Sequence, residues 1–171
     1  MPELRVLHVS DPHFSEAHHY FKQSEGEAAE SLLLTAILDG SQPDLLCVTG
    51  DIVWSGIEEE YVIAQRFFRL VRSRAPRVPV LTIPGNHDVD LRDSVPDVDR
   101  QKSFLRFLRK LYSRRALEAV FPLLGDPRFE HLSPRERLVA LMVNDHYVVV
   151  GVNTAAYLRA HGEPASQLPA S

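Results

Sequence analysis

Short apolar runs alternate with helical periodicity through the first half of the chain. Residues 3–9, 45–49 and 78–83 are rich in apolar and β-branched side chains, and turn-forming residues follow each run, which predicts three strands. Residues 25–39 and 57–74 place apolar side chains three and four positions apart, which predicts amphipathic helices. The resulting β-α-β-α-β order predicts a parallel sheet with right-handed crossovers.

The pattern changes after the third predicted strand. Residues 84–98 form a loop rich in proline and aspartate, and residues 100–119 again carry apolar side chains at helical spacing. The stretch that follows contains Pro122, Gly125 and Pro127, and we expect it to be irregular. One further helix is therefore predicted in this part of the chain.

Two more strands are predicted near the end of the sequence. Residues 137–143 and 146–153 are rich in valine and are joined at Asn144-Asp145, a pair typical of a tight hairpin turn. Residues 160–171 contain glycine and proline without any hydrophobic period, which predicts an irregular tail.

Composition narrows the class of protein without identifying its chemistry. The chain has 171 residues, of which 44% are hydrophobic and 25% charged, and its formal net charge is −4, all ordinary for a soluble globular protein. No apolar run approaches the roughly 20 residues of a membrane helix, and the N-terminus lacks a secretory pattern, so we expect a cytoplasmic protein without a membrane partner. The negative charge does not indicate nucleic-acid binding but leaves it open. Cys47 lies within an apolar run, which predicts a buried, inert thiol.

Polar residues suited to metal binding follow each of the first three strands. Asp11 and His13 follow the first strand, Asp51 the second and Asn86 the third. If the backbone is extended there, Asp11 and His13 point the same way, and the carboxyl ends of parallel strands lie side by side. Oxygen and nitrogen ligands of this kind suit Mn, Fe or Zn.

The short polar string that follows each strand could instead be a simple turn between strand and loop. Aspartate, asparagine, glycine and proline are common turn formers, and Gly50 and Gly85 would let the chain bend sharply. Because all three strings occur in order, each after its own strand, a shared site is the favoured interpretation.

The strings Asp11-Pro12-His13, Gly50-Asp51 and Gly85-Asn86-His87-Asp88 resemble the first three of five motif blocks of the calcineurin-like metallophosphoesterase superfamily. The segment from Gly50 to Tyr61 is most similar to cyclic-nucleotide-phosphodiesterase-like members. The resemblance implies an α/β fold in which a β-sandwich is flanked by helices. It also implies a phosphate-ester substrate, hydrolysed by a hydroxide that bridges two metal ions.

The resemblance assigns a role to each candidate residue. It implies that Asp11 and His13 bind the first of two divalent or trivalent ions (Mn, Fe or Zn), that Asp51 bridges both ions and that Asn86 binds the second. Two residues would serve the reaction. His87 would act as general acid or stabilise the transition state, and Asp88 would orient His87 by accepting its other N–H.

The last two blocks, a lone histidine and Gly-His-x-His, are not found in this sequence. We therefore expect residues 1–171 to be the N-terminal part of a single metallophosphoesterase domain: a parallel βαβαβ half, a helix, and a hairpin that starts the second sheet. A C-terminal half-domain or a partner would cover that incomplete sheet, and we expect weak or no activity from this chain alone. The alternative is a non-catalytic binding or scaffold module with the same fold.

Overall fold

The computed structural model describes residues 3–15, 35 and 43–157. Strands β1 (Val6–Ser10), β2 (Leu45–Thr49) and β3 (Val80–Ile83) form a parallel sheet in the order β1-β2-β3. Apolar side chains of β2 and β3 are buried, as expected for strands covered on both faces. The parallel arrangement confirms the prediction, while the predicted helix at 25–39 lies outside the described residues except for Thr35.

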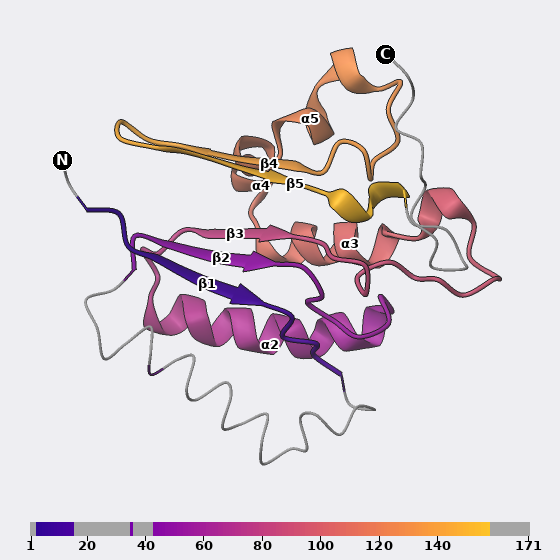
Figure 1. Ribbon diagram of the computed structural model, residues 1–171, viewed down its shortest axis with the longest axis horizontal. Coiled ribbons are helices and arrows are strands. Elements are labelled where there is room, and N and C mark those ends of the chain that lie inside the picture. The colour runs from indigo at the N-terminus through magenta and orange to yellow at the C-terminus, as the bar shows by residue number, and fades with distance from the viewer. Residues whose placement is uncertain (1–2, 16–34, 36–42, 158–171) are drawn as a thin grey trace.

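Helix α2 (Glu58–Arg74) connects β2 to β3 and lies below the three-stranded sheet (Figure 1). Its bounds agree with the helix predicted at 57–74. Acidic side chains occupy its first turn and basic ones its last, which favours the helix dipole. The apolar face that the sequence indicated is buried against the core: it comprises Tyr61, Ala64, Phe67, Phe68 and Val71.

The single helix predicted at 100–119 is wrong, because two helices occupy this segment. Helix α3 (Lys102–Leu111) ends where Tyr112 adopts an extended backbone with ψ of 145°. Helix α4 (Arg114–Val120) then begins after Ser113, whose side chain accepts a hydrogen bond from the backbone N–H of Ala116. The buried Tyr112 hydroxyl donates to the carbonyl of Val80 in β3, so a tertiary contact fixes the break.

The stretch expected to be irregular contains short helical turns. Helix α5 (Pro122–Gly125) has its proline in the first turn, where the missing N–H costs nothing. A 3-10 turn, η3 (Pro127–Phe129), follows after Asp126, which accepts from the backbone N–H of Arg128. Another such turn, η2 (Asp97–Asp99), lies within the preceding proline-rich loop.

The predicted hairpin is present, with a longer turn than expected. Strands β4 (Val139–Val143) and β5 (Val148–Val152) pair in antiparallel fashion, and Val143 lies opposite Val148. The connection is therefore the four-residue segment 144–147. The Asn144 side chain accepts from two backbone N–H groups of this turn, which explains why a two-residue turn was not adopted. A 3-10 turn, η4 (Thr154–Tyr157), follows β5.

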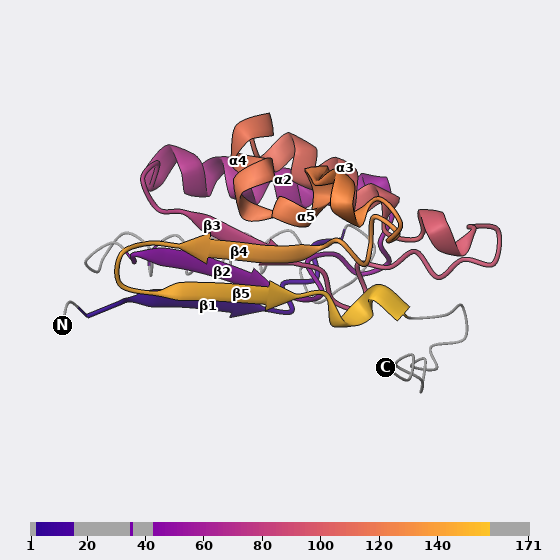
Figure 2. The same cartoon turned by 90° about the horizontal axis from the view of Figure 1, so that it is seen from above.

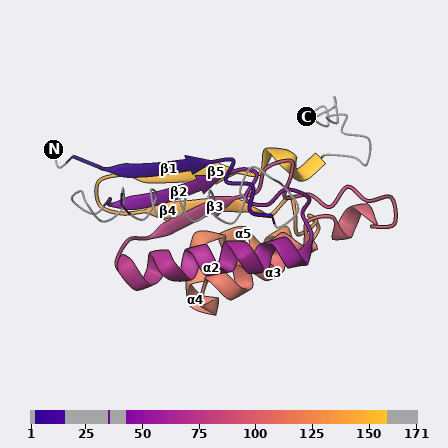
Figure 3. The same ribbon diagram turned by 90° about the horizontal axis from the view of Figure 1, so that it is seen from below.

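The hairpin forms a second β-layer above the parallel sheet (Figure 1). Figures 2 and 3 show α2, α3, α4 and α5 gathered along one side of the two layers. Gly151 of β5 lies against Ile83 of β3, because a Cβ atom placed on Gly151 would come within 1.8 Å of Ile83 Cδ1. This architecture confirms the predicted fold class: a parallel sheet and an antiparallel hairpin packed face to face, with helices alongside.

The remaining expectations are tested only in part or not at all by the structure, apart from the burial of Cys47. None of the described helices is long and apolar enough to cross a membrane, and the cytoplasmic location stays a prediction. The tail at 160–171 lies outside the described residues, and the assignment of residues 1–171 to part of one domain is also untested. Cys47 is buried in β2, and burial raises the pKa of its thiol, in agreement with an inert side chain.

Candidate metal centre

Three of the predicted ligands converge at the carboxyl end of the parallel sheet. Asp11 and His13 follow β1, and Asp51 follows β2. His13 Nε2 lies 4.0 Å from Asp11 Oδ1 and 3.9 Å from Asp51 Oδ2. One ligand atom from each residue lies within 4.8 Å of the other two. Within the described part of the chain, this is the one cluster of acidic, imidazole or thiol side chains close enough to hold an ion.

The backbone that presents these ligands differs from the extended conformation expected. Asp11, His13 and Asp51 have φ angles of +54°, +45° and +48°, in the left-handed region that non-glycine residues seldom adopt. Backbone bonds explain the conformation, since the N–H groups of Asp11 and His13 donate to the carbonyls of Gly50 and Asp51. The loops that follow β1 and β2 thus continue side by side beyond the ends of these strands. Strained residues held this way are typical of functional sites.

The donor set fits a first-row transition-metal ion. Ligand atoms about 2 Å from such an ion lie about 3–4 Å apart, and the distances from His13 Nε2 to the two carboxylates are close to this spacing. His13 Nδ1 is buried without a hydrogen-bond partner among the described residues, so the ring is not oriented by a protein acceptor. Two carboxylates and one imidazole would provide the charge and the ligand types that Mn, Fe or Zn takes.

Asp51 also links this cluster to the loop after β3. Its Oδ1 accepts a hydrogen bond of 2.9 Å from the backbone N–H of His87. Gly85 allows this approach, because a Cβ atom there would lie 2.3 Å from Asp51 Oδ1. Asn86, the predicted ligand of a second ion, is exposed on the same loop. Its role as a ligand stays a prediction.

The predicted hydrogen bond from His87 to Asp88 is wrong. The Asp88 carboxylate is fully buried and turned into the protein, where donors from other residues occupy both of its oxygens. These donors are the backbone N–H groups of Ile52, Val53 and Gly85 and the hydroxyl of Tyr61, at 2.9 to 3.2 Å. Asp88 therefore links the loop that follows β2 to the loop that follows β3.

Trp54 takes the place that the sequence had suggested for Asp88. Its backbone carbonyl lies 2.5 Å from His87 Nδ1. Its indole ring lies 4.7 Å from the His87 ring and 5.1 Å from the His13 ring, between ring centres. The rings of His13 and His87 are themselves 4.9 Å apart. His87 thus borders the ligand cluster, and its role in the reaction stays a prediction.

The sequence did not predict the contact of Trp54 with His87 or that of Tyr61 with Asp88. Trp54 is the chain's one tryptophan and directly follows the apolar pair Ile52 and Val53, but residue identity does not indicate which backbone carbonyl accepts a hydrogen bond. Tyr61 fits the apolar stripe of α2. A buried tyrosine hydroxyl usually has a hydrogen-bond partner, and this rule could have indicated that Tyr61 bonds to a polar group of the site.

Burial dominates the electrostatics around Asp88. It raises the pKa of Asp88 to about 6, although the N–H groups of Gly85, Ile52 and Val53 and the Tyr61 hydroxyl favour the charged form. Burial first, and the neighbouring Asp88 charge second, raise the pKa of Tyr61 well above its usual value. Tyr61 therefore remains protonated and can donate to Asp88.

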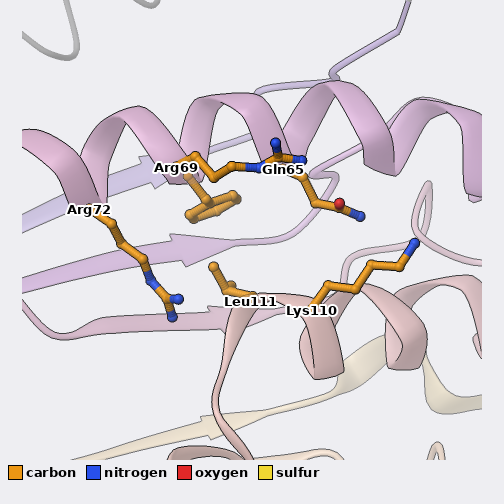
Figure 4. A pocket seen from close by; sticks show the side chains of 6 residues that line it. Gln65, Arg69, Arg72, Lys110 and Leu111 are labelled. Atoms are coloured by element: carbon orange, nitrogen blue, oxygen red, sulfur yellow. The ribbon is translucent and has the colours of Figure 1, made fainter.

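A pocket of about 300 Å³ lies elsewhere, between α2 and α3 (Figure 4). Its lining contains no carboxylate or imidazole, so it lacks the ligands of a metal centre. The residues that line it are Gln65, Phe68, Arg69, Arg72, Lys110 and Leu111.

Comparisons with known proteins agree with the geometry. A family model described as calcineurin-like phosphoesterase matches residues 4–165. The chain is also similar to the glycerophosphodiester phosphodiesterase GpdQ of Enterobacter lignolyticus (strain SCF1), with 37% identity over 87 residues. That alignment covers 50% of this chain and 30% of the relative's length.

Proposed function

The chain belongs to the calcineurin-like phosphoesterase family, and from this premise we propose that it hydrolyses phosphate esters at a metal centre held by Asp11, His13 and Asp51. The observation that carries the proposal is the convergence of these three side chains, each with a left-handed backbone, at the carboxyl edge of the parallel sheet. A structural turn would not require three strained residues to direct polar side chains to one point.

We further propose that two ions of Mn, Fe or Zn are bound, with Asn86 as a ligand of the second. Asp51 is suited to a position between them, because one of its oxygens faces His13 while the other faces the loop that carries Asn86 and His87. When bound, the ions supply Lewis-acid stabilisation of the negative charge on the phosphate oxygens.

His87 is the residue we propose to handle the proton of the leaving group. Its ring borders that of His13, so it lies beside the ligand cluster. Its Nδ1 lies within hydrogen-bond distance of the backbone carbonyl of Trp54. Its Nε2 has no hydrogen-bond partner among the described residues and is available to a substrate oxygen.

The similarity to a glycerophosphodiester phosphodiesterase supports phosphodiesters as the substrate class. The assay follows hydrolysis of bis-p-nitrophenyl phosphate with and without Mn²⁺. Even weak turnover should depend on Mn²⁺ and fall at least ten-fold in Asp51→Asn, since this change removes a charged ligand. The exposed Asp93→Asn provides a matched control with unchanged activity. Turnover that is equal in Asp51→Asn, or independent of metal, would contradict the proposal.

A further inference from the structure

The contact between His87 and Trp54 determines which imidazole nitrogen carries the proton. A backbone carbonyl has no hydrogen to donate, so the 2.5 Å contact with His87 Nδ1 is a hydrogen bond only if Nδ1 is the donor. In the neutral ring, Nε2 is then the unprotonated nitrogen. Nothing in the loop sequence indicates this choice.

The carbonyl is held in place because two loops are locked together around it. On one side of Trp54, the N–H groups of Ile52 and Val53 donate to the buried carboxylate of Asp88, next to His87. On the other side, Gly56 has a φ of +70° and lies so close to the third loop that a Cβ atom would be 2.7 Å from Asp90 N. The Trp54 carbonyl therefore cannot move away from His87 without breaking one of these contacts.

The indole side chain constrains the plane of the imidazole as well. The Trp54 ring is inclined at 38° to the His87 ring and lies within contact distance of it, and the His13 ring meets His87 edge-on at 84°. Rotation of the His87 side chain would push its ring into one of these neighbours. The ring is thus confined by two aromatic contacts and one hydrogen bond.

We propose that Trp54 is the positioning residue for His87: its carbonyl keeps the imidazole proton on Nδ1, and its indole fixes the ring plane, so that Nε2 meets the substrate. The inference rests on the proposed function for the identity of the substrate, but not for the tautomer. Trp54 need not touch the substrate to have this effect.

The tautomer can be tested in the metal-free protein by NMR. Long-range ¹H–¹⁵N correlation spectra of ¹⁵N-histidine-labelled protein above about pH 8, where an ordinary imidazole is neutral, should show His87 protonated at Nδ1. His87→Gln assigns the signals by removing them. Trp54→Gly and Trp54→Phe both keep the backbone carbonyl at residue 54, so His87 should stay protonated at Nδ1 in both variants. Ser55→Ala, an exposed change one position further along the loop, is the matched control.

Kinetics of the Mn²⁺-loaded protein provide the second measurement. Trp54→Gly should lower kcat at least about ten-fold with KM within two-fold. The doubly protonated His87 ring would pass its Nε2 proton to the leaving oxygen and keep its Nδ1 proton, and a misplaced ring slows this transfer without weakening substrate binding. Trp54→Phe should recover most of kcat. His87 protonated at Nε2 in the wild type, or an unchanged kcat in Trp54→Gly, would overturn the inference. An Nδ1-protonated His87 in a protein without hydrolytic activity would support the positioning role and contradict the proposed function.

Discussion

At the scale of single residues, the site depends on conformations and contacts that work against stability. Asp11, His13 and Asp51 occupy left-handed backbone positions, which cost about 1–2 kcal/mol each for an L-residue. Asp88 keeps a carboxylate in a fully buried position. The surrounding hydrogen bonds offset these costs, and both features have consequences that single substitutions can measure.

The strain at Asp11 predicts a difference between two substitutions that both remove its carboxylate. Asp11→Gly should be more stable than Asp11→Ala by about 1 kcal/mol, because glycine adopts a φ of +54° without a Cβ clash. Both variants should bind Mn²⁺ more weakly than the wild type. Urea unfolding of the metal-free proteins measures the difference, and equal midpoints would mean that the backbone at residue 11 is not strained.

The buried carboxylate of Asp88 predicts a large loss of stability for Asp88→Asn. An amide can accept hydrogen bonds through only one of its two polar atoms, so buried donors from Ile52, Val53, Gly85 or Tyr61 would lose their partner. The expected cost is about 3 kcal/mol in the free energy of unfolding. Asp93→Asn, on the exposed surface, should change it by less than about 0.5 kcal/mol. A similar small effect in both variants would rule out the role assigned to Asp88.

At the scale of elements, the two faces of strand β5 have opposite environments. Val148, Val150 and Val152 alternate along the strand and are 58% to 61% exposed. Val149 and Gly151 face inward, and Val149 packs against the hydrophobic core. The uncovered apolar surface expected at the hairpin is thus a row of valines on its outer face. A patch of this kind favours association with other apolar surfaces.

Matched substitutions on the two faces should separate exposure from packing. Val150→Thr keeps the β-branched shape that strands favour, so it should leave thermal stability almost unchanged while reducing binding of a hydrophobic fluorescent dye. Val149→Thr places a hydroxyl against the core and should lower stability by about 1–2 kcal/mol without a similar loss of dye binding. Equal effects of the two changes would mean that the hairpin is oriented differently.

At the scale of the whole molecule, the sequence predicted where the site lies better than how it is held. Apolar runs and helix periods established the parallel sheet, and the polar residues after each strand identified the edge where Asp11, His13 and Asp51 meet. Their backbone angles, the break at Tyr112 and the partners of Asp88 depend on contacts between distant segments. Local patterns of residue types do not predict contacts between segments that are far apart in the sequence.

The central claim is that this edge of the sheet binds metal through Asp11, His13 and Asp51, and calorimetric titration with Mn²⁺ tests it most directly. The metal-free wild type should give saturable binding with heat that disappears in Asp51→Asn, because that variant loses a charge at the centre of the cluster. Asp93→Asn should bind as the wild type does. Absence of Mn²⁺ and Zn²⁺ binding in the folded wild type, or binding that Asp51→Asn leaves unchanged, would contradict the claim and favour a non-catalytic module.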